Sequence, residues 1–113
     1  MEMRADKQTL LLIADLITRQ QVKSVFSNNT FIRNSSELEE NLTAEPQQII
    51  VDLANTKIDI DLALEAIHAA GFADRTLCFY PHVQVVLAKK ALELGFENVQ
   101  IRSKFFKSLK QGF

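Results

Sequence analysis

The chain has 113 residues, of which 47% are hydrophobic and 24% charged, and its formal net charge is −1. This length suits one domain, so we expect a single domain over residues 1–113 without a separate output domain. The small net charge points away from nucleic acid as an obligatory partner, and the longest unbroken apolar run, residues 10–14, is too short to span a membrane. Cys78 is the single cysteine, so an intrachain disulfide is excluded and a reducing, cytoplasmic location is expected.

Short apolar runs alternate with longer helical segments along the chain. Three runs are almost continuously apolar, which is typical of central parallel strands buried on both faces: residues 9–14, 48–51 and 76–80. Two further runs, residues 30–34 and 98–102, turn polar quickly or alternate with polar residues. They are predicted to be edge strands, which are short or half exposed.

Five helices are predicted between and after these strands. The first covers residues 16–27, and the second opens with a capping box formed by Ser36 and Glu39. The third covers residues 59–70 and has a wide apolar face. The fourth runs from Pro81 to Leu94, since proline suits a first helical turn, and a short fifth helix follows Ser103.

The order of these elements predicts the fold class. Strands that alternate with helices indicate an α/β, doubly wound, five-stranded parallel sheet covered by helices on both faces. Three interior strands and two edge strands match the strand order 2-1-3-4-5, the flavodoxin-like three-layer arrangement. Ligands of such sheets bind outside the carboxyl ends of the strands, so the residues at those ends are the candidate site.

The strand ends resemble those of a response-regulator receiver domain over nearly the whole chain. Asp52 follows the apolar run of the third strand, at the place of the phosphorylated aspartate in receivers. Ala14 and Asp15 stand where receivers carry an acidic pair, so one of the two acids is missing. Tyr80 stands at the place of a serine or threonine.

The fifth strand departs from the family as well. Receivers end it with lysine followed by proline, and here the two positions are Arg102 and Ser103. The segment of residues 78–83, followed later by residues 102–105, also resembles a divergent receiver-like group whose fourth strand ends with His-Val and whose fifth ends with Arg-Ser.

The resemblance implies a pocket around Asp52. In receivers, carboxylates hold Mg²⁺, so Asp15 and Asp52 are candidates for a weak Mg²⁺ site. Arg102 supplies a cation for phosphoryl oxygens, and a small hydroxyl that normally turns toward the phosphoryl group is lost at Tyr80. The expected pocket residues around the phosphoacceptor-like aspartate are Asp15, Tyr80, His82, Arg102, Ser103 and Lys104.

Simpler interpretations of the same residues stay open. Asp15 precedes a helix and is also a natural N-cap, and Asp52 is able to bond the backbone of the following turn. Arg102 is a candidate for a permanent salt bridge with Asp52 that replaces metal and phosphate. Cys78 is expected to be an unreactive core residue, and His68 is expected on a helix surface.

The leading functional hypothesis is a stand-alone, divergent receiver-like signalling module that is not an enzyme and acts through a partner protein without normal phospho-switching. The partner is a histidine kinase or another signalling protein, or a second copy docked on the face of the fourth helix, fifth strand and fifth helix. The alternative is a phosphorylatable single-domain response regulator with Asp52 as phosphoacceptor. A small flavodoxin-like cofactor-binding protein ranks third, because the chain has no glycine-rich phosphate loop.

Overall fold

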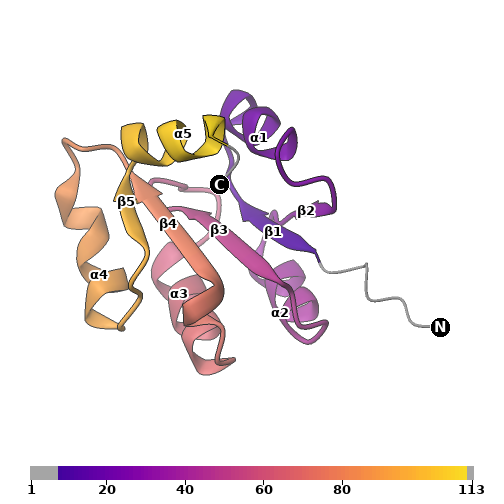
Figure 1. Ribbon diagram of the computed structural model, residues 1–113. Helices are drawn as coiled ribbons and strands as arrows, with labels where there is room; N and C mark the ends of the chain where they lie inside the picture. The colour runs from indigo at the N-terminus through magenta and orange to yellow at the C-terminus, as the bar shows by residue number, and fades with distance from the viewer. Residues whose placement is uncertain (1–7, 112–113) are drawn as a thin grey trace.

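The computed structural model describes residues 8–111, which form one sheet with helices on both faces (Figure 1). The sheet has five parallel strands in the order β2-β1-β3-β4-β5, as predicted. The strands are β1 (Thr9–Leu12), β2 (Asn29–Phe31), β3 (Gln48–Asp52), β4 (Thr76–Tyr80) and β5 (Val99–Ile101). The three central strands are almost wholly buried, whereas β2 and β5 are only partly buried.

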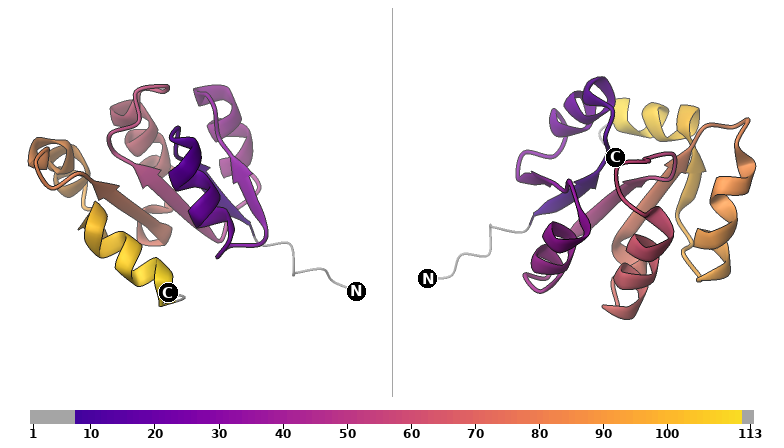
Figure 2. Two further views of the ribbon diagram at one scale, coloured as in Figure 1. Left: turned by 90° about the horizontal axis from the view of Figure 1, so that it is seen from above. Right: turned by 180° about the vertical axis from the view of Figure 1, so that it is seen from behind.

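The helices divide between the two faces of the sheet (Figures 1 and 2). One layer consists of α1 (Leu16–Lys23) and α5 (Arg102–Lys110), and the other of α2 (Ser35–Leu42), α3 (Ile60–Ala69) and α4 (Ala88–Glu93). Two 3₁₀ turns, η2 (Ala73–Arg75) and η3 (Val85–Leu87), precede β4 and α4. None of the helices in residues 8–111 is long and apolar enough to cross a membrane.

Strand alternation gives each layer its own apolar core. Leu10 and Leu12 of β1 pack toward α2, α3 and α4, whereas Leu11 of the same strand packs toward α1 and α5. In β3, Ile49 and Val51 face the first of these cores. Asp52 follows Ile50 by two residues, and Ile50 belongs to the α1/α5 core, so alternation sends the Asp52 carboxylate toward the α1/α5 side.

The predicted bounds of α3 agree with the structure, whereas the predicted N-terminal cap of α2 does not. The Asp59 side chain caps α3 by accepting a hydrogen bond from the Leu62 amide. The predicted capping box of Ser36 and Glu39 is wrong. The N-cap of α2 is Asn34, whose Oδ1 accepts from the amide of Glu37. The error is a shift of register: several Ser, Asn and Glu side chains follow one another here, and the cap falls on the residue with extended backbone.

The fourth helix begins later than predicted. Residues after Pro81 form a turn closed by the Gln84 amide on the Pro81 carbonyl at 2.8 Å, followed by η3. The β-branched valines of this segment disfavour helix, and no side chain caps the start of α4. The first helix also ends at Lys23 rather than at residue 27.

Candidate functional site

Asp52 ends β3 in a tight turn at the carboxyl edge of the sheet. Its side chain is 6% exposed, and its Oδ1 accepts a hydrogen bond of 3.0 Å from the Ala54 amide. Its carbonyl accepts from the Asn55 amide at 2.9 Å. The backbone-bonding interpretation of Asp52 therefore holds, and it leaves the second carboxylate oxygen without a hydrogen bond to residues 8–111.

Asp15 caps α1 and contacts a buried threonine. Its Oδ2 accepts from the amide of Thr18 at 2.9 Å and from the hydroxyl of Thr18 at 2.5 Å. Thr18 is fully buried, so its hydroxyl must find partners within the protein. The N-cap interpretation of Asp15 is therefore correct, and the cap fixes where the Thr18 hydroxyl lies.

Arg102, the first residue of α5, reaches the same hydroxyl from the other side. Its Nη2 donates to Thr18 Oγ1 at 2.6 Å. Its guanidinium carbon lies 4.8 Å from the ring centre of Phe106 and 5.8 Å from that of Phe79. A planar guanidinium stacks well on aromatic faces, so the arginine is held by one hydrogen bond and two rings.

The two carboxylates differ in electrostatics although they share one cation. Burial raises the pKa of Asp52; the amide of Ala54 and the charge of Arg102 counteract this rise, and the charge of Asp15 adds to it. Hydrogen bonds from Thr18 hold the pKa of Asp15 below its usual range, with a smaller contribution from the charge of Arg102. The charge of Arg102 thus acts on both carboxylates, and the charge of Asp15 acts on Asp52, at one edge of the sheet.

Arg102 and Asp52 do not form the permanent salt bridge that was one alternative. Within the part of the chain that the structure describes, ion pairs join Arg33 to Glu37 and Lys90 to Glu65, and neither involves Arg102. The guanidinium donates instead to the Thr18 hydroxyl.

Comparison with solved structures identifies the fold. No family model matches this sequence, and no curated protein is significantly similar to it. The signal receiver domain of an HD domain-containing protein from Pseudomonas fluorescens Pf-5 superimposes with a TM-score of 0.71 at 16% identity, over 94% of this chain and 85% of that chain. This is the receiver fold.

Two further structures with the receiver fold match over the same length. Full-length FixJ from B. japonicum gives a TM-score of 0.70 at 14% identity, over 94% of this chain and 57% of that chain. The chain therefore spans little more than half the length of FixJ. The beryllofluoride-activated NtrC4 receiver domain dimer gives a TM-score of 0.69 at 13% identity, over 94% of this chain and 95% of that chain.

The receiver fold brings only some of the predicted pocket residues together. Asp15, Asp52 and Arg102 are close enough that the charge of Arg102 affects the pKa of both acids. Tyr80 packs instead against the α2–α4 core, on the same face as Cys78. His82 is exposed in the turn after β4, whereas a position in the first turn of α4 was predicted.

Within residues 8–111, neither Ser103 nor Lys104 makes a hydrogen bond or ion pair with Asp52. Both are exposed in the first turn of α5 and line a shallow hollow along that helix, together with Lys107, Ser108 and Gln111. Cys78 is fully buried, and burial raises its pKa to about 12, so its thiol is an unreactive core group. His68 is exposed on α3, as predicted.

Two polar residues of this edge were not predicted. Thr18 joins Asp15 to Arg102, and Asn55 is 7% exposed with its Nδ2 donating to the carbonyl of Leu12 at 3.2 Å. A threonine in the first turn of a helix gives no sequence signal of such a role. Asn55 did have one, because it closes the Asp-Leu-Ala-Asn turn after a central strand.

The carboxylates of this edge fit a divalent cation only in part. Asp15 and Asp52 each keep one oxygen free of hydrogen bonds to residues 8–111, and Mg²⁺ takes one or two carboxylates together with water. Neither at this edge nor elsewhere in that range is a group of three His, Cys, Asp or Glu side chains placed to hold a metal ion. Asp15 and Asp52 would hold Mg²⁺ here, which would neutralise charge on a bound phosphoryl group.

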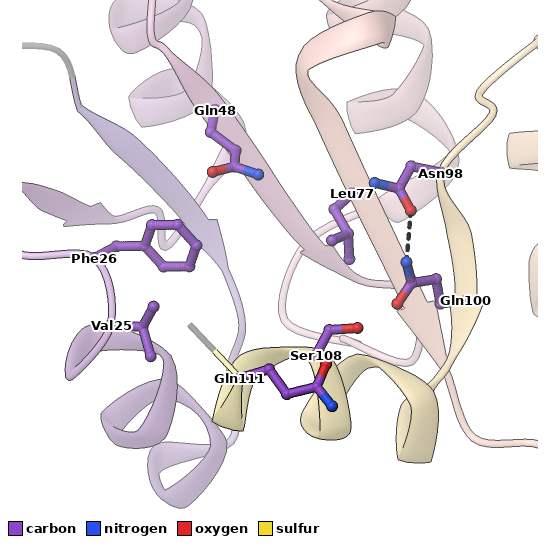
Figure 3. Close-up of a pocket in the computed structure, with 8 residues that line it drawn as sticks. All are labelled: Val25, Phe26, Gln48, Leu77, Asn98, Gln100, Ser108 and Gln111. Atoms are coloured by element: carbon purple, nitrogen blue, oxygen red, sulfur yellow. Dashed lines mark hydrogen bonds between the residues drawn. The ribbon is translucent and has the colours of Figure 1, made fainter. Parts of the chain in front are cut away.

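A separate hollow of about 610 Å³ lies at the opposite edge of the sheet, between the C-terminal ends of α1 and α5 (Figure 3). Its polar side chains are uncharged amides and one hydroxyl. Within residues 8–111, Gln100 Oε1 is buried there without a hydrogen-bond partner, while its Nε2 donates to Asn98 Oδ1 at 2.8 Å. The lining of the hollow has no acid or base to activate the Ser108 hydroxyl, so we assign it no chemistry.

Proposed function

We propose that this chain is a divergent receiver-like signalling module that acts by binding a partner protein and lacks the normal phospho-switch. The observation that carries the proposal is the hydrogen bond between Arg102 and Thr18. The receiver geometry that the resemblance implies would need a cation directed at the Asp52 phosphoryl group. Here Arg102, the first residue of α5, is bound to Thr18 of α1 and stacked on Phe79 and Phe106.

The switch residue supports the same proposal. A hydroxyl that reports phosphorylation has to move toward the phosphoryl group. Tyr80 carries its hydroxyl on a rigid ring that packs against the α2–α4 core, whereas alternation directs Asp52 to the other face. A phosphoryl group on Asp52 would therefore lack a residue that transmits its presence to α4.

An apolar surface marks the face that we assign to the partner. Large apolar side chains are exposed in the segment before α4, on α4 and on β5, and they are Val83, Val85, Val86, Leu92 and Ile101. Five large apolar side chains exposed on neighbouring segments of a small protein are consistent with an interaction site. We propose that it binds a histidine kinase, another signalling protein or a second copy of the chain, in the cytoplasm, and that the module is not an enzyme.

A second candidate function rests on the Asp52 carboxylate, which is buried but unpaired within residues 8–111. The carboxylate has no ion-pair partner in residues 8–111, and one of its oxygens makes no hydrogen bond there. This arrangement favours a phosphorylatable response regulator, in which Asp52 takes a phosphoryl group with the help of Mg²⁺.

Acetyl phosphate with Mg²⁺ separates the two functions. The protein and its Asp52→Asn variant are incubated with the phosphodonor, and the intact mass is measured together with the amide NMR spectrum. The proposal expects no phosphoryl gain, or a gain that leaves the amides of α4 and β5 unchanged. A gain of one phosphoryl group that is lost in Asp52→Asn and shifts the amides of α4 and β5 would establish the phosphorylatable regulator instead.

A further inference from the structure

A basic hollow lies beside the carboxylates, on the β2 side of the sheet. It measures about 420 Å³, within the range of small-molecule sites, and contains no acidic side chain among its lining residues Ala14, Arg19, Phe31, Ile32, Arg33, Asn55 and Lys57. Three of these are bases, contributed by α1, the segment after β2 and the loop after β3. Basic groups from three separate segments therefore converge on one hollow.

Arg19 is held in place from two directions. Its Nη1 donates to the carbonyl of Ile13 at 3.1 Å and to that of Ala14 at 3.5 Å. Its guanidinium carbon lies 3.6 Å from the ring centre of Phe31. A guanidinium carries five N–H donors, so these contacts orient it and leave donors for a ligand.

Lys57 is the base with the fewest constraints on its charged end. Its backbone amide donates to Asn55 Oδ1 at 2.8 Å, and Asn55 is itself anchored on Leu12, so the loop that carries Lys57 is fixed. The ammonium makes no ion pair within the part of the chain that the structure describes. An uncompensated ammonium on a fixed loop is available to bind an anion.

Arg33 has a carboxylate partner but retains a free donor group. Its Nε and Nη2 donate to Glu37, and Nη1 has no partner within residues 8–111. The hollow thus has three bases. Arg33 is paired with Glu37 and Arg19 interacts with the charge of Asp15, and both acids stand outside the lining. The small side chain of Ala14 matters here, because a carboxylate at that position would place a negative charge on the wall of the hollow.

We propose that this hollow binds a small phosphate ester. A phosphate group carries up to two negative charges and accepts hydrogen bonds from guanidinium and ammonium donors, which are the groups that the hollow presents. Phe31 and Ile32 supply an apolar wall for the organic part of the ester. The site is distinct from Asp52, whose carboxylate repels anions, and it does not depend on the phosphorylation of that residue.

Phenyl phosphate is the probe for an NMR titration of the ¹⁵N-labelled protein, without Mg²⁺ and at constant ionic strength. We expect saturable shifts of the amides of Ala14, Ile32 and Lys57. Inorganic phosphate binds more weakly because it lacks the apolar part, and neutral benzyl alcohol gives no saturable shifts. Asp52→Asn removes a repelling charge and leaves the affinity the same or higher, which separates this site from the second candidate function, in which Asp52 is required.

Two lysine variants with the same change of charge test the assignment. Lys57→Gln weakens phenyl phosphate binding by about fivefold, as loss of one partly exposed ion pair does. Lys23→Gln, at an exposed position of α1 outside the lining, leaves it unchanged. The proposal is overturned by a titration without saturation, by equal loss in both variants, or by binding that disappears in Asp52→Asn.

Discussion

Arg102 Nη2 donates a hydrogen bond of 2.6 Å to the hydroxyl of Thr18, a residue 84 positions earlier in the chain. The same hydroxyl donates to Asp15, so one buried threonine joins the cation of α5 to the acid that caps α1. The cation is thereby held on the α1/α5 side of the sheet edge.

Replacing this threonine tests the link directly. Thr18→Val keeps the shape and removes the hydroxyl, which leaves Arg102 and Asp15 each without one partner. We expect the free energy of unfolding to fall by about 1–2 kcal/mol, as for other buried hydrogen-bonding groups, measured by urea denaturation at neutral pH. Thr43→Val, at an exposed C-cap, is the matched control and should change it by less than about 0.5 kcal/mol.

The same variant has a titration signature. Thr18 is the main reason that the pKa of Asp15 is low, so in Thr18→Val that pKa should rise toward its ordinary value. A carboxyl ¹³C titration measures the change. An unchanged pKa of Asp15 would show that the hydroxyl contact does not persist in solution.

Asp52 is expected to reduce stability at neutral pH. Burial raises its pKa in the folded protein, so ionisation is less favourable there than in the unfolded chain, and stability falls as pH rises above the unfolded value near 3.8. Asp52→Asn removes the charge and keeps an oxygen for the Ala54 amide. We expect it to stabilise the protein by roughly 1 kcal/mol at pH 7, with the gain shrinking on acidification, when the wild-type carboxyl also becomes neutral.

Thermal unfolding of Asp52→Asn and the wild type from pH 4 to pH 8 checks this expectation. Glu39→Gln, an exposed change of the same type on α2, controls for net charge. An advantage that grows toward low pH would contradict the assigned direction of the Asp52 pKa.

Ala14→Asp should have opposite effects on two ligands. A carboxylate next to Asp15 adds an oxygen ligand beside Asp52, so Mg²⁺ should bind at least about tenfold more tightly by calorimetry. The same charge lies on the wall of the basic hollow and should weaken phenyl phosphate by about fivefold. Ala14→Asn matches the size without the charge and should show neither effect. A parallel change of both affinities would mean that the substitution acts through the fold.

Val86 tests the face assigned to the partner. Val86 and Ile17 are both 71% exposed, but Val86 lies before α4 and Ile17 lies on α1. We expect the wild type to self-associate in sedimentation velocity experiments, and Val86→Lys to weaken the dimer by about tenfold, whereas Ile17→Lys leaves it intact. A wild type that remains monomeric at millimolar concentration would rule out a second copy as partner.

Cys78 should resist thiol reagents in the folded protein. It is fully buried, and its pKa of about 12 leaves almost no thiolate at pH 8. We expect Ellman's reagent to modify none of the native protein in minutes and one thiol per chain after denaturation. Rapid modification of the native protein would show that β4 opens locally.

The central strands were predictable because burial on both faces leaves continuous apolar runs. The runs that contain Leu11, Ile50 and Cys78 could be placed in the interior and the two more polar runs at the edges, which predicted the strand order. The start of α4 was not predictable from Pro81, since the preference of proline for a first turn competes with the valines that follow. The Asn34 cap was missed because its neighbours are equally good caps.

Of the candidate site, only the residues at the strand ends could be predicted from the sequence. Asp15 and Asp52 were expected to approach each other because the ends of parallel strands meet at one edge, and the charge of Asp15 does contribute to the raised pKa of Asp52. The partner of Arg102 was not predictable. The contact with Thr18 depends on how α1 packs against α5, and a local sequence pattern does not determine this packing.

The sheet separates two apolar cores, and no buried side chain belongs to both cores within residues 8–111. The residues that hold Arg102 belong to the layer of α1 and α5, whereas the exposed valines precede α4 in the other layer. Mutation can therefore reshape the outer surface of one layer while the packing of the other is preserved, so the two halves of this small protein are free to diverge at different rates.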